Sequence, residues 1–492
     1  MNDWMNRLAR HYKEAQRLYP NDRLLILFDI DGTILDMRYM IHYVLKDYDH
    51  HHGTAFFETL KVGDITVHET EIEQLIGMLS IPPERRSDIY EWYVKHCWSM
   101  EAIMEAHRPF SGVMEVIRWF QIQPNTFVGL NTGRPESIRD ETISSLNKIG
   151  KAYKVNFGNR LCYMNRHGWN ADVATSKVAA FLHFQKMGFR VFAFVDNEPE
   201  NLAHVADCDP QGKVLMLHAD TIFRSQRKRI PPGAASGDTY NIQGLIDEKS
   251  LPDHVQFVWH GVNDRRNLER FLASNIRWAE FDLHLDGKDR RIVLGDQLLN
   301  TCVDAPEQLY IDEVIDTLLS RNKSVKLDLK ENGPLIERVI CFLKKWGVSD
   351  SNIWFNADVH RIQEIGFRTL AMAFPGAIIQ SPIDFMVPLI LSTPSKACAL
   401  LDNLSKCGIN RLSLSWKNPD MRSVLDTLDT WGFEINIYNV PDLESFLKAV
   451  LLLPDSITSD FDLPQWPYYD RTQSRSFYTH VSTTHVLEDL LL

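Results

Sequence analysis

Residues 24–36 read LLILFDIDGTILD, and this stretch decides the fold of the first half of the chain. The apolar run 24–28 has the length and composition of a buried strand, and Asp29 and Asp31 follow it directly. Side chains alternate along an extended chain, so the two carboxylates lie on the same side. At the carboxyl end of a parallel strand, such a pair faces the crevice in which α/β proteins bind ligands. The sequence therefore predicts a ligand site at this strand end.

Three further segments of the first half carry polar residues at matching places. FVGLNTGRP places Thr132 at the end of a second predicted strand, where its hydroxyl is able to hold a phosphoryl oxygen. ATSKVAAFL places Lys177 early in a helix, from which an ammonium group reaches a neighbouring crevice. VFAFVDNEPENL ends a third predicted strand in Asp196. Alternating strands and helices of this kind indicate a parallel sheet with crossover helices.

These residue types match the needs of phosphoryl transfer, which requires a nucleophile, a proton donor and positive charge on the phosphoryl oxygens. We expect Asp29 to attack phosphorus and Asp31 to protonate the leaving oxygen and later deprotonate water. Lys177 and a hard cation would neutralise the charge that repels a carboxylate nucleophile. Mg²⁺ suits a site of two carboxylates, a backbone carbonyl and waters. A lone pair of aspartates after a strand is more often a turn, but four motifs in this order argue against that interpretation.

The four segments resemble the motifs of the haloacid dehalogenase superfamily, here Asp29/Asp31, Thr132, Lys177 and Asp196. The resemblance implies that Asp29 is the nucleophile and Asp31 the acid/base, with a metal held by Asp29, the Asp31 carbonyl and Asp196. The second aspartate is typical of the phosphatase members. The resemblance to this superfamily also implies a Rossmannoid core with a helical cap insertion at about 38–107, after which RPFSGVMEVIRWF returns to the core.

A chain of 492 residues is too long for one ordinary core, so we expect two domains. The boundaries predicted are 1–225 for the first domain, 226–252 for a linker rich in Pro, Gly and Ser, 253–470 for the second domain and 471–492 for a C-terminal tail. In the second domain the strand and helix alternation restarts. The candidate strands are 255–259, 278–283, 325–329, 353–356, 369–373, 378–380, 411–415 and 434–438. Eight strands of the parallel type predict a TIM-barrel-like (β/α)₈ domain.

Polar residues again lie at predicted strand ends in the second domain. His260 follows one strand, Glu280 and Asp282 lie two apart on the next with His284 in phase, and Asp328 lies on a third. If the strands form one barrel, these side chains converge at its rim, where barrel active sites form. Three carboxylates there predict a Ca²⁺ or Mg²⁺ site. The alternative is an ion-pair network in which Lys326, Lys330 or Arg291 neutralises them.

HGVND, AEFDLHLDG, KLDLK, IWFNADV and SITSDF, taken in order, resemble the glycerophosphodiester phosphodiesterase-like barrels, including the menorin-like branch. The resemblance implies two catalytic histidines, of which the first is His260. It also implies that the three carboxylates named above bind a metal and that SITSDF forms the closing strand. Gly295, in IVLGDQ, occupies the place of the second histidine, and glycine cannot transfer a proton. Either His284 substitutes for it, or the barrel has become a binding module.

We interpret the sequence as that of an Mg²⁺-dependent phosphomonoester hydrolase fused to a barrel. Either the barrel supplies the monoester from a diester, or it only binds a ligand or partner. The expected partner is a small phosphate ester. The formal net charge of −12 argues against a nucleic-acid surface. Seven singly placed cysteines, no signal-peptide pattern and no apolar run of membrane length predict a cytoplasmic protein. The histidines at 50–52 fall in the cap, where a solvated loop is favoured over a metal site.

Overall fold

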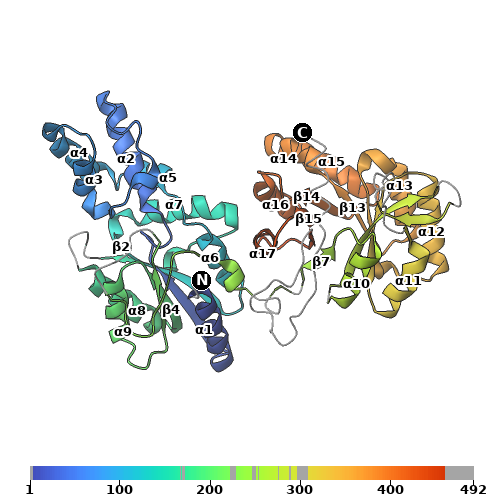
Figure 1. Cartoon of the computed structure of the whole chain (residues 1–492), viewed down its shortest axis with the longest axis horizontal. Coiled ribbons are helices and arrows are strands. Elements are labelled where there is room, and N and C mark those ends of the chain that lie inside the picture. Colours follow the sequence, from blue (N-terminus) through green and yellow to red (C-terminus); the bar gives the residue numbers. More distant parts are fainter. Residues whose placement is uncertain are drawn as a thin grey trace. The chain divides into compact units, whose positions relative to one another are not determined.

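The computed structural model describes residues 4–459 except 167, 169–171, 222–228, 247–250, 253, 275, 287–289 and 296–307. The chain forms two compact units, Met1–Ile246 and Asp247–Leu492, each of which is an α/β structure (Figure 1). The division falls inside the predicted linker 226–252. The predicted tail 471–492 lies outside the described residues. Among the described residues, no helix combines the length and the apolar character that a membrane crossing requires.

The first unit is built on a six-stranded sheet in the order β3-β2-β1-β4-β5-β6, and all neighbouring strands are parallel. The parallel sheet predicted from the sequence is therefore confirmed. Its strands are β1 (Arg23–Phe28), β2 (Thr126–Pro135), β3 (Cys162–Asn165), β4 (Phe189–Asp196), β5 (Leu215–Ala219) and β6 (Ala235–Gly237). The helices that pack on this sheet are α1 (Trp4–Leu18), α6 (Val113–Gln121), α7 (Arg139–Gly150), α8 (Val173–Lys186) and α9 (Pro199–Asp207).

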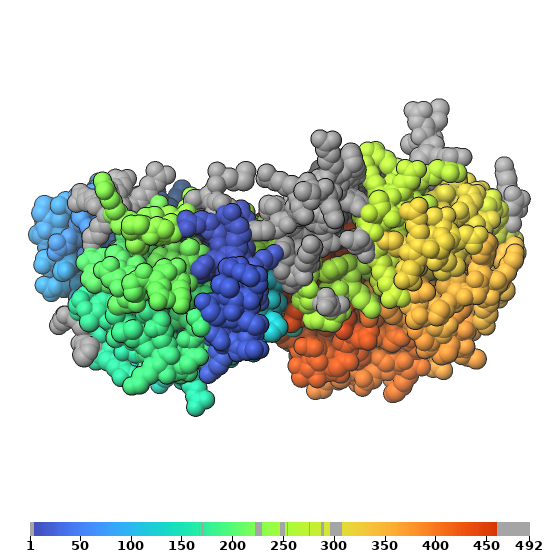
Figure 2. All heavy atoms as spheres, turned by 90° about the horizontal axis from the view of Figure 1, so that it is seen from below, coloured from blue at the N-terminus to red at the C-terminus, as the bar shows by residue number. Residues whose placement is uncertain are grey.

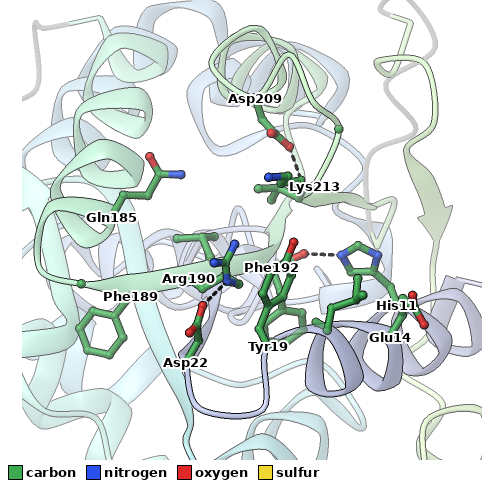
Figure 3. Close-up of a pocket in the computed structure, with 16 residues that line it drawn as sticks. His11, Glu14, Tyr19, Asp22, Gln185, Phe189, Arg190, Phe192, Asp209 and Lys213 are labelled. Carbon is green, nitrogen blue, oxygen red and sulfur yellow. Dashed lines mark hydrogen bonds and ion pairs between the residues drawn. The ribbon is translucent and has the colours of Figure 1, made fainter.

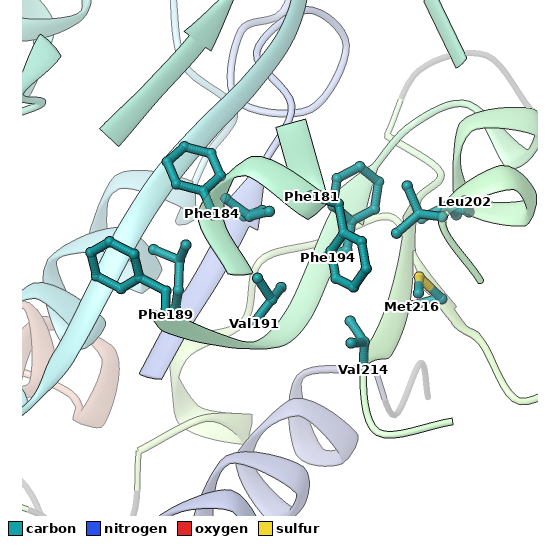
Figure 4. Close-up of a cluster of buried hydrophobic side chains, with 11 residues drawn as sticks. Phe181, Phe184, Phe189, Val191, Phe194, Leu202, Val214 and Met216 are labelled. Atoms are coloured by element: carbon teal, nitrogen blue, oxygen red, sulfur yellow. The ribbon is translucent and has the colours of Figure 1, made fainter. Parts of the chain in front are cut away.

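The two faces of this sheet have separate aromatic cores. On one face, Tyr12 of α1 lies against Phe120 of α6 and Phe192 of β4, with ring centroids 5.1 and 5.2 Å apart. On the other, Phe181 and Phe184 of α8 pack with side chains of β4, α9 and β5 (Figure 4). In the space-filling view α1 is the dark blue segment, which lies against green residues of the same unit (Figure 2).

The cap is helical, as predicted, and lies between β1 and α6 in the sequence. It contains α2 (Met37–His52), α3 (Ile72–Met78), α4 (Pro83–His96) and α5 (Met100–Ala106), with the short 3₁₀ helices η1 (Val62–Asp64) and η2 (Glu69–Glu71). Asp36 caps α2 by accepting from the Arg38 amide, and Gly53 in the left-handed region ends it.

Part of the predicted linker belongs to the first unit. Residues of β6 extend the sheet beside β5. Just beyond them, Trp4 donates to the Thr239 carbonyl at 2.7 Å and the Tyr240 hydroxyl donates to the Thr33 carbonyl at 2.9 Å. Composition identified a region of turns here, but it does not reveal pairing with a sheet edge.

The second unit is a closed barrel of eight parallel strands, which confirms the predicted fold class. The strands are β7 (Gln256–Trp259), β8 (Trp278–Leu285), β11 (Ser324–Leu329), β12 (Ile353–Asn356), β13 (Ile378–Pro382), β14 (Arg411–Ser415), β15 (Glu434–Val440) and β16 (Ser456–Ser459). Closure comes from β7, which pairs in parallel with both β16 and β8. A short antiparallel extension, β9 (Ile292–Leu294) and β10 (Leu309–Tyr310), continues from β8.

The helices around this barrel are α10 (Arg265–Ala273), α11 (Ile311–Ser320), α12 (Pro334–Lys345), α13 (Val359–Ala373), α14 (Val387–Ser392), α15 (Pro394–Lys406), α16 (Met421–Thr430) and α17 (Leu443–Val450). One predicted strand is wrong, because 369–373 is the end of α13. Ile362, Gly366 and Leu370 are buried at four-residue intervals, and a short apolar run does not by itself distinguish helix from strand. The eighth strand is β16, which was expected from the SITSDF resemblance.

Candidate active sites

The predicted residues of the first unit meet at the carboxyl edge of its sheet. β1 and β4 are parallel neighbours in which Phe28 pairs with Val195, so Asp29 and Asp196 come next on adjacent strands. The Asp29 amide donates to the Val195 carbonyl at 2.9 Å. On the other side Phe28 pairs with Leu130 of β2, so Thr132 lies two residues past this pair at the same edge.

A tight turn after β1 brings Asp31 back toward the site, and Gly32 makes this turn possible. Its φ is +73°, which a residue with a side chain rarely adopts. A Cβ at this position would also lie 2.4 Å from the side chain of Asn197. Glycine is thus required both by the backbone conformation and by the close approach of the β4–α9 loop.

Lys177 reaches the site from α8, and the helix is fixed by the aromatic side chains that follow it. Phe181 and Phe184 lie one and two turns later on the same face and are fully buried in the core cluster (Figure 4). The ammonium group contacts Asp29 Oδ1, lies 3.0 Å from Asp196 Oδ2 and donates to the Asn131 carbonyl at 2.5 Å. The predicted pairing of a lysine with the nucleophile is therefore present in the structure.

Burial and charge act in opposite directions on this pair. Burial raises the pKa of the Asp29 carboxyl, and the Lys177 ammonium lowers it only in part. Burial alone would lower the pKa of Lys177, but the carboxylates of Asp196 and Asp29 together raise it. Lys177 is thus held as a cation. The ionised form of Asp29 is destabilised by burial, and another nearby cation would reduce this destabilisation.

The oxygens of Asp196, predicted as a metal ligand, already have partners within the protein. Asp196 is fully buried, and its oxygens are taken by Lys177, by the Glu198 amide at 2.8 Å and by the Asn201 side chain at 3.0 Å. The oxygens of Asp196 thus face Lys177 and groups of α9 and the loop before it, whereas the next residue, Asn197, lies beside Asp29 and Asp31. One atom of the Asn197 side-chain amide lies 3.1 Å from the Asp31 carbonyl oxygen and 3.2 Å from Asp29 Oδ2.

These three groups fit a hard cation. If the amide nitrogen of Asn197 faces the two oxygens it donates to both, and if its oxygen faces them the three oxygens form one set. Oxygen ligands of this kind are those that Mg²⁺ takes in proteins. The group contains only one carboxylate side chain, in agreement with the finding that the described residues hold no cluster of three His, Cys, Asp or Glu suited to a metal. The sequence analysis missed Asn197 because an acidic ligand was expected.

Arg134 is a second residue that the sequence analysis missed. Its buried guanidinium binds Asp31 through two hydrogen bonds, Nε to Oδ2 at 2.8 Å and Nη2 to Oδ1 at 2.6 Å. Thr132, predicted to hold a phosphoryl oxygen, is fully buried and accepts a hydrogen bond from the Arg134 amide at 3.1 Å. The motif NTGRP contained both residues, but nothing in it showed that the arginine pairs with a carboxylate 103 positions earlier.

The cap contributes one carboxylate near this site. Glu69 of η2 is largely buried, and burial together with the charge of Asp31 raises its pKa to about 7. Its Oε2 lies 3.3 Å from His68 Nε2, which also lies 3.7 Å from Glu198 of the core. The histidines predicted in a solvated loop instead end the helix α2, where His51 and His52 pack their rings against Trp92 of α4.

In the barrel, a cavity of about 330 Å³ lies at the carboxyl ends of the strands. Its lining includes His260, Glu280, Lys326, Asp328, Lys330 and Arg361. His260 Nε2 lies 3.4 Å from Glu280 Oε2. The convergence of these residues at one rim of a barrel is as predicted.

The carboxylates at this rim are paired with lysines. Lys330 Nζ lies 2.7 Å from Asp282 Oδ1 and 2.5 Å from Asp328 Oδ2, and so fills the space between them. Lys326 Nζ lies 3.4 Å from Glu280 Oε1, so Glu280 points toward a different cation. This arrangement is the ion-pair alternative and not the predicted metal site, because a cation bound by all three carboxylates would need the place that Lys330 takes. Arg291 is not part of it, since it pairs with Asp312 and Glu313.

These ion pairs act on the two aspartates differently. Burial alone would raise the pKa of Asp282, but Lys330 and His260 lower it below its usual range. For Asp328 the effect of burial prevails over Lys330, and its pKa is raised. The pair of aspartates thus shares one ammonium group, whose own pKa their charges raise.

Among the described residues that line the cavity, His260 is the only histidine. His284 does not line it, and its Nδ1 lies 3.4 Å from Glu331 Oε1. Gly295 donates its amide to the Asp282 carbonyl at 3.0 Å, which places it beside the predicted site. Its φ is +130°, and a Cβ there would meet no atom within 4 Å. The proposed substitution of His284 for the missing acid/base is therefore not supported by its position.

A further cavity of about 480 Å³ lies at the opposite end of the first unit's sheet (Figure 3). It is lined by the beginning of β4 and by α1, together with residues next to them. Arg190 bonds Asp22 at 2.5 Å and stacks on Tyr19, and His11 Nε2 lies 2.9 Å from the Phe192 carbonyl. None of the predicted site residues reaches it.

No protein-family model matches the chain, and no curated protein matches it. Solved structures do match. A putative glycerophosphoryl diester phosphodiesterase from Agrobacterium tumefaciens is 13% identical, covering 42% of this chain and 93% of its own, with a TM-score of 0.35. A putative phosphoglycolate phosphatase from Lactobacillus plantarum is 13% identical, covering 40% of this chain and 86% of its own, with a TM-score of 0.25.

A hydrolase of the haloacid dehalogenase family from Deinococcus radiodurans, solved with bound phosphate and sodium, is 12% identical. It covers 43% of this chain and 89% of its own, with a TM-score of 0.28. Both resemblances noted in the sequence thus have counterparts among solved structures. At these identities and TM-scores the matches say nothing about substrate or activity, which must be inferred from the chain's own residues.

Proposed function

We propose that the first unit is a phosphomonoester hydrolase that acts through a phosphorylated Asp29. The observation that supports the proposal most directly is the contact of Lys177 with Asp29 at the carboxyl edge of the sheet, with Asp31 at the same edge. A nucleophile, a proton-transfer group and a fixed cation are the parts that phosphoryl transfer requires. A scaffold needs no such set of buried charges, which are costly to hold together.

In the first step, an oxygen of Asp29 bonds to phosphorus while the bond from phosphorus to the ester oxygen breaks. The leaving oxygen takes the proton that Asp31 brings into this step, and the alcohol departs. In the second step, Asp31 takes a proton from water, whose oxygen bonds to phosphorus as the bond to Asp29 breaks. Inorganic phosphate leaves, and the Asp29 carboxylate and protonated Asp31 are restored.

Lys177 holds positive charge beside Asp29 through both steps, and Asp196 and the Asn131 carbonyl fix its position. We infer that Mg²⁺ would be held by Asp29 Oδ2, the Asp31 carbonyl and the Asn197 amide oxygen. When bound, the ion would withdraw negative charge from the phosphoryl oxygens. Asp29, whose burial raises its pKa, would also be more fully ionised beside it.

The test is phosphate release by the full-length protein from a panel of phosphomonoesters and phosphodiesters, with and without Mg²⁺. We expect Mg²⁺-dependent release from monoesters. Acid quenching during turnover followed by peptide mass analysis should find one added phosphoryl group on the peptide that contains Asp29. A panel that gives neither phosphate nor a modified Asp29 peptide would contradict the proposal.

For the barrel, we propose a binding module for a phosphate ester and not a second hydrolase. The cavity is lined by Arg361 beside the two paired lysines, and the Oε1 atom of the buried Gln380 has no hydrogen-bond partner there. That oxygen would accept a hydrogen bond from a ligand hydroxyl. Isothermal titration with glycerol phosphate, compared between the parent and Arg361→Met, tests this function. Release of a monoester from a diester, lost in His260→Ala, would favour the diesterase instead.

A further inference from the structure

Arg134 holds the Asp31 carboxylate by both of its oxygens. The guanidinium side chain is fully buried, while Asp31 is 17% exposed at the site. A bidentate arginine–carboxylate pair fixes the plane of the carboxylate as well as its place. With Nε on Oδ2 and Nη2 on Oδ1, Asp31 cannot turn about its last side-chain bond without breaking one hydrogen bond.

The arginine is itself held by a chain of buried groups that ends on the cap. Its Nη2 lies 3.0 Å from His107 Nε2, and since arginine cannot accept a hydrogen bond, this histidine nitrogen is the acceptor. The proton of the ring is then on Nδ1, which donates to Ser145 Oγ at 2.7 Å. The Ser145 hydroxyl donates in turn to the Ile103 carbonyl of α5 at 2.9 Å.

The chain also depends on a neutral histidine. Burial, and to a lesser degree the positive charge of Arg134, lower the pKa of His107 far below its usual range. The neutral ring is the form that accepts from Arg134 at one nitrogen and donates at the other. Every donor along this chain therefore has an acceptor, from the cap helix to the carboxylate at the site.

We propose that Arg134 is the positioning residue for Asp31, held in place by His107 and Ser145 against the cap helix α5. This assignment rests on the proposed hydrolase function. The guanidinium of Arg134 bonds to Asp31, Thr142 and His107 and not to Asp29, so we expect it to act through Asp31. Its loss should slow the two proton transfers that Asp31 performs and leave the attack of Asp29 on phosphorus intact.

The test compares p-nitrophenyl phosphate, whose leaving group needs no proton, with an alkyl phosphate, whose leaving group does. In Arg134→Met we expect kcat/KM for p-nitrophenyl phosphate to change less than about threefold, because this constant reports the first step. For the alkyl phosphate it should fall by about a hundredfold. The second step also slows, so p-nitrophenolate should be released in a burst and phosphorylated Asp29 should accumulate.

Matched variants separate positioning from loss of folding. Arg411→Met removes another buried arginine, which pairs with Glu434 inside the barrel, and should show neither the leaving-group effect nor the burst. Ser145→Ala breaks the chain at its far end without emptying the arginine site, and should give a weaker form of the same pattern. Addition of guanidinium to Arg134→Ala should restore part of the alkyl phosphate rate.

Equal losses for both substrates in folded Arg134→Met, without a burst, would overturn the assignment and leave the proposed hydrolase intact. Strictly additive losses of kcat/KM in Arg134→Met, Asp31→Asn and their double variant would also overturn the assignment and leave the proposed hydrolase intact. Two residues that act as one unit show losses that do not add. A parent protein that releases no phosphate and carries no phosphoryl group on Asp29 would overturn the hydrolase proposal and this assignment together.

Discussion

The two units have the same types of charged side chain at the carboxyl ends of their strands, but these side chains contact one another differently. Each has carboxylates at the carboxyl ends of parallel strands and a lysine among them. In the first unit Lys177 comes from a helix and lies between Asp29 and Asp196, with one oxygen of each near its ammonium group. In the barrel Lys330 lies on the chain just after Asp328 and occupies the space between two carboxylates.

This difference decides which oxygens remain for a ligand. Asp29 Oδ2 lies 3.2 Å from one atom of the Asn197 side-chain amide, which also lies 3.1 Å from the Asp31 carbonyl oxygen, so this oxygen is directed to the place that we propose for a cation. Asp282 and Asp328 are neutralised by the protein's own ammonium group. The second oxygen of Asp29 thus lies beside the Asp31 carbonyl and Asn197, whereas the second oxygens of Asp282 and Asp328 accept hydrogen bonds from the side chains of Asn263 and Asn356.

The largest expected effect is that of Asp29→Asn. An amide is a poor nucleophile, so phosphate release from monoesters should fall by about a thousandfold or more. Asp282→Asn, the matched change in the barrel, should leave this rate unchanged. A rapid phosphate assay on both folded proteins checks the pair. Substantial turnover by Asp29→Asn, or an equal loss in Asp282→Asn, would break the distinction between the two sites.

Asp31→Asn should have the next largest effect, and the effect should depend on the substrate. An amide cannot donate the proton, so kcat/KM for alkyl phosphates should fall by about 10²–10⁴-fold. For p-nitrophenyl phosphate the same constant should change little. The measurement is a series of phenyl and alkyl phosphates with leaving groups of increasing pKa. A loss that is the same along the whole series would contradict the role of Asp31.

A site residue could be predicted from the sequence when it belongs to a recognisable motif or lies close in sequence to its partner. Asp29, Lys177 and the barrel class followed from order and spacing, because parallel strands present their carboxyl ends at one edge. Arg134 was not found, since its partner lies 103 residues away and no local pattern connects the two. Asn197 was passed over for Asp196, because a strand pattern does not show which of two successive side chains faces the site.

The barrel illustrates a second limit of the sequence. Residues 369–373 have strand composition but complete a helix, because burial at helical intervals along α13 outweighs the local preference. The sequence contains three cations able to neutralise the carboxylates, but only the structure shows that Lys330 lies between Asp282 and Asp328. Sequence reasoning identified the participants at this site but not their pairing.

The third prediction concerns stability in the barrel. Lys330→Met leaves Asp282 and Asp328 buried together without their ammonium group, which should cost about 3–5 kcal/mol of unfolding free energy. Millimolar Mg²⁺ or Ca²⁺ should restore part of this loss by taking the vacated place. Denaturant unfolding of the full chain measures both effects, with Lys448→Met, which removes a lysine paired with the exposed Glu444, as the control. Tight binding of either metal by the parent barrel would show that Lys330 does not exclude it.

The smallest effect is expected from Glu69→Gln, and it depends on pH. The pKa of Glu69 is raised to about 7 in the folded protein by burial and by the charge of Asp31. The folded state then binds this proton more tightly than the unfolded state, whose carboxyl titrates near its ordinary value of about 4.3. Stability therefore falls as the pH rises from about 4.5 to about 7. Above this window the ionised Glu69 destabilises the folded protein.

A glutamine at position 69 cannot ionise, so at pH 8 the variant should be more stable than the parent by about 1–3 kcal/mol. At pH 4.5 the two proteins should differ little. Glu105→Gln, which removes an exposed carboxylate of the same cap, should show no such window. Mg²⁺ should narrow the difference at pH 8, because a cation beside Asp29 and Asp31 reduces the negative charge that Glu69 meets. A gain that is the same at both pH values would mean that it does not come from the ionisation of Glu69, and would contradict a raised pKa for this carboxyl.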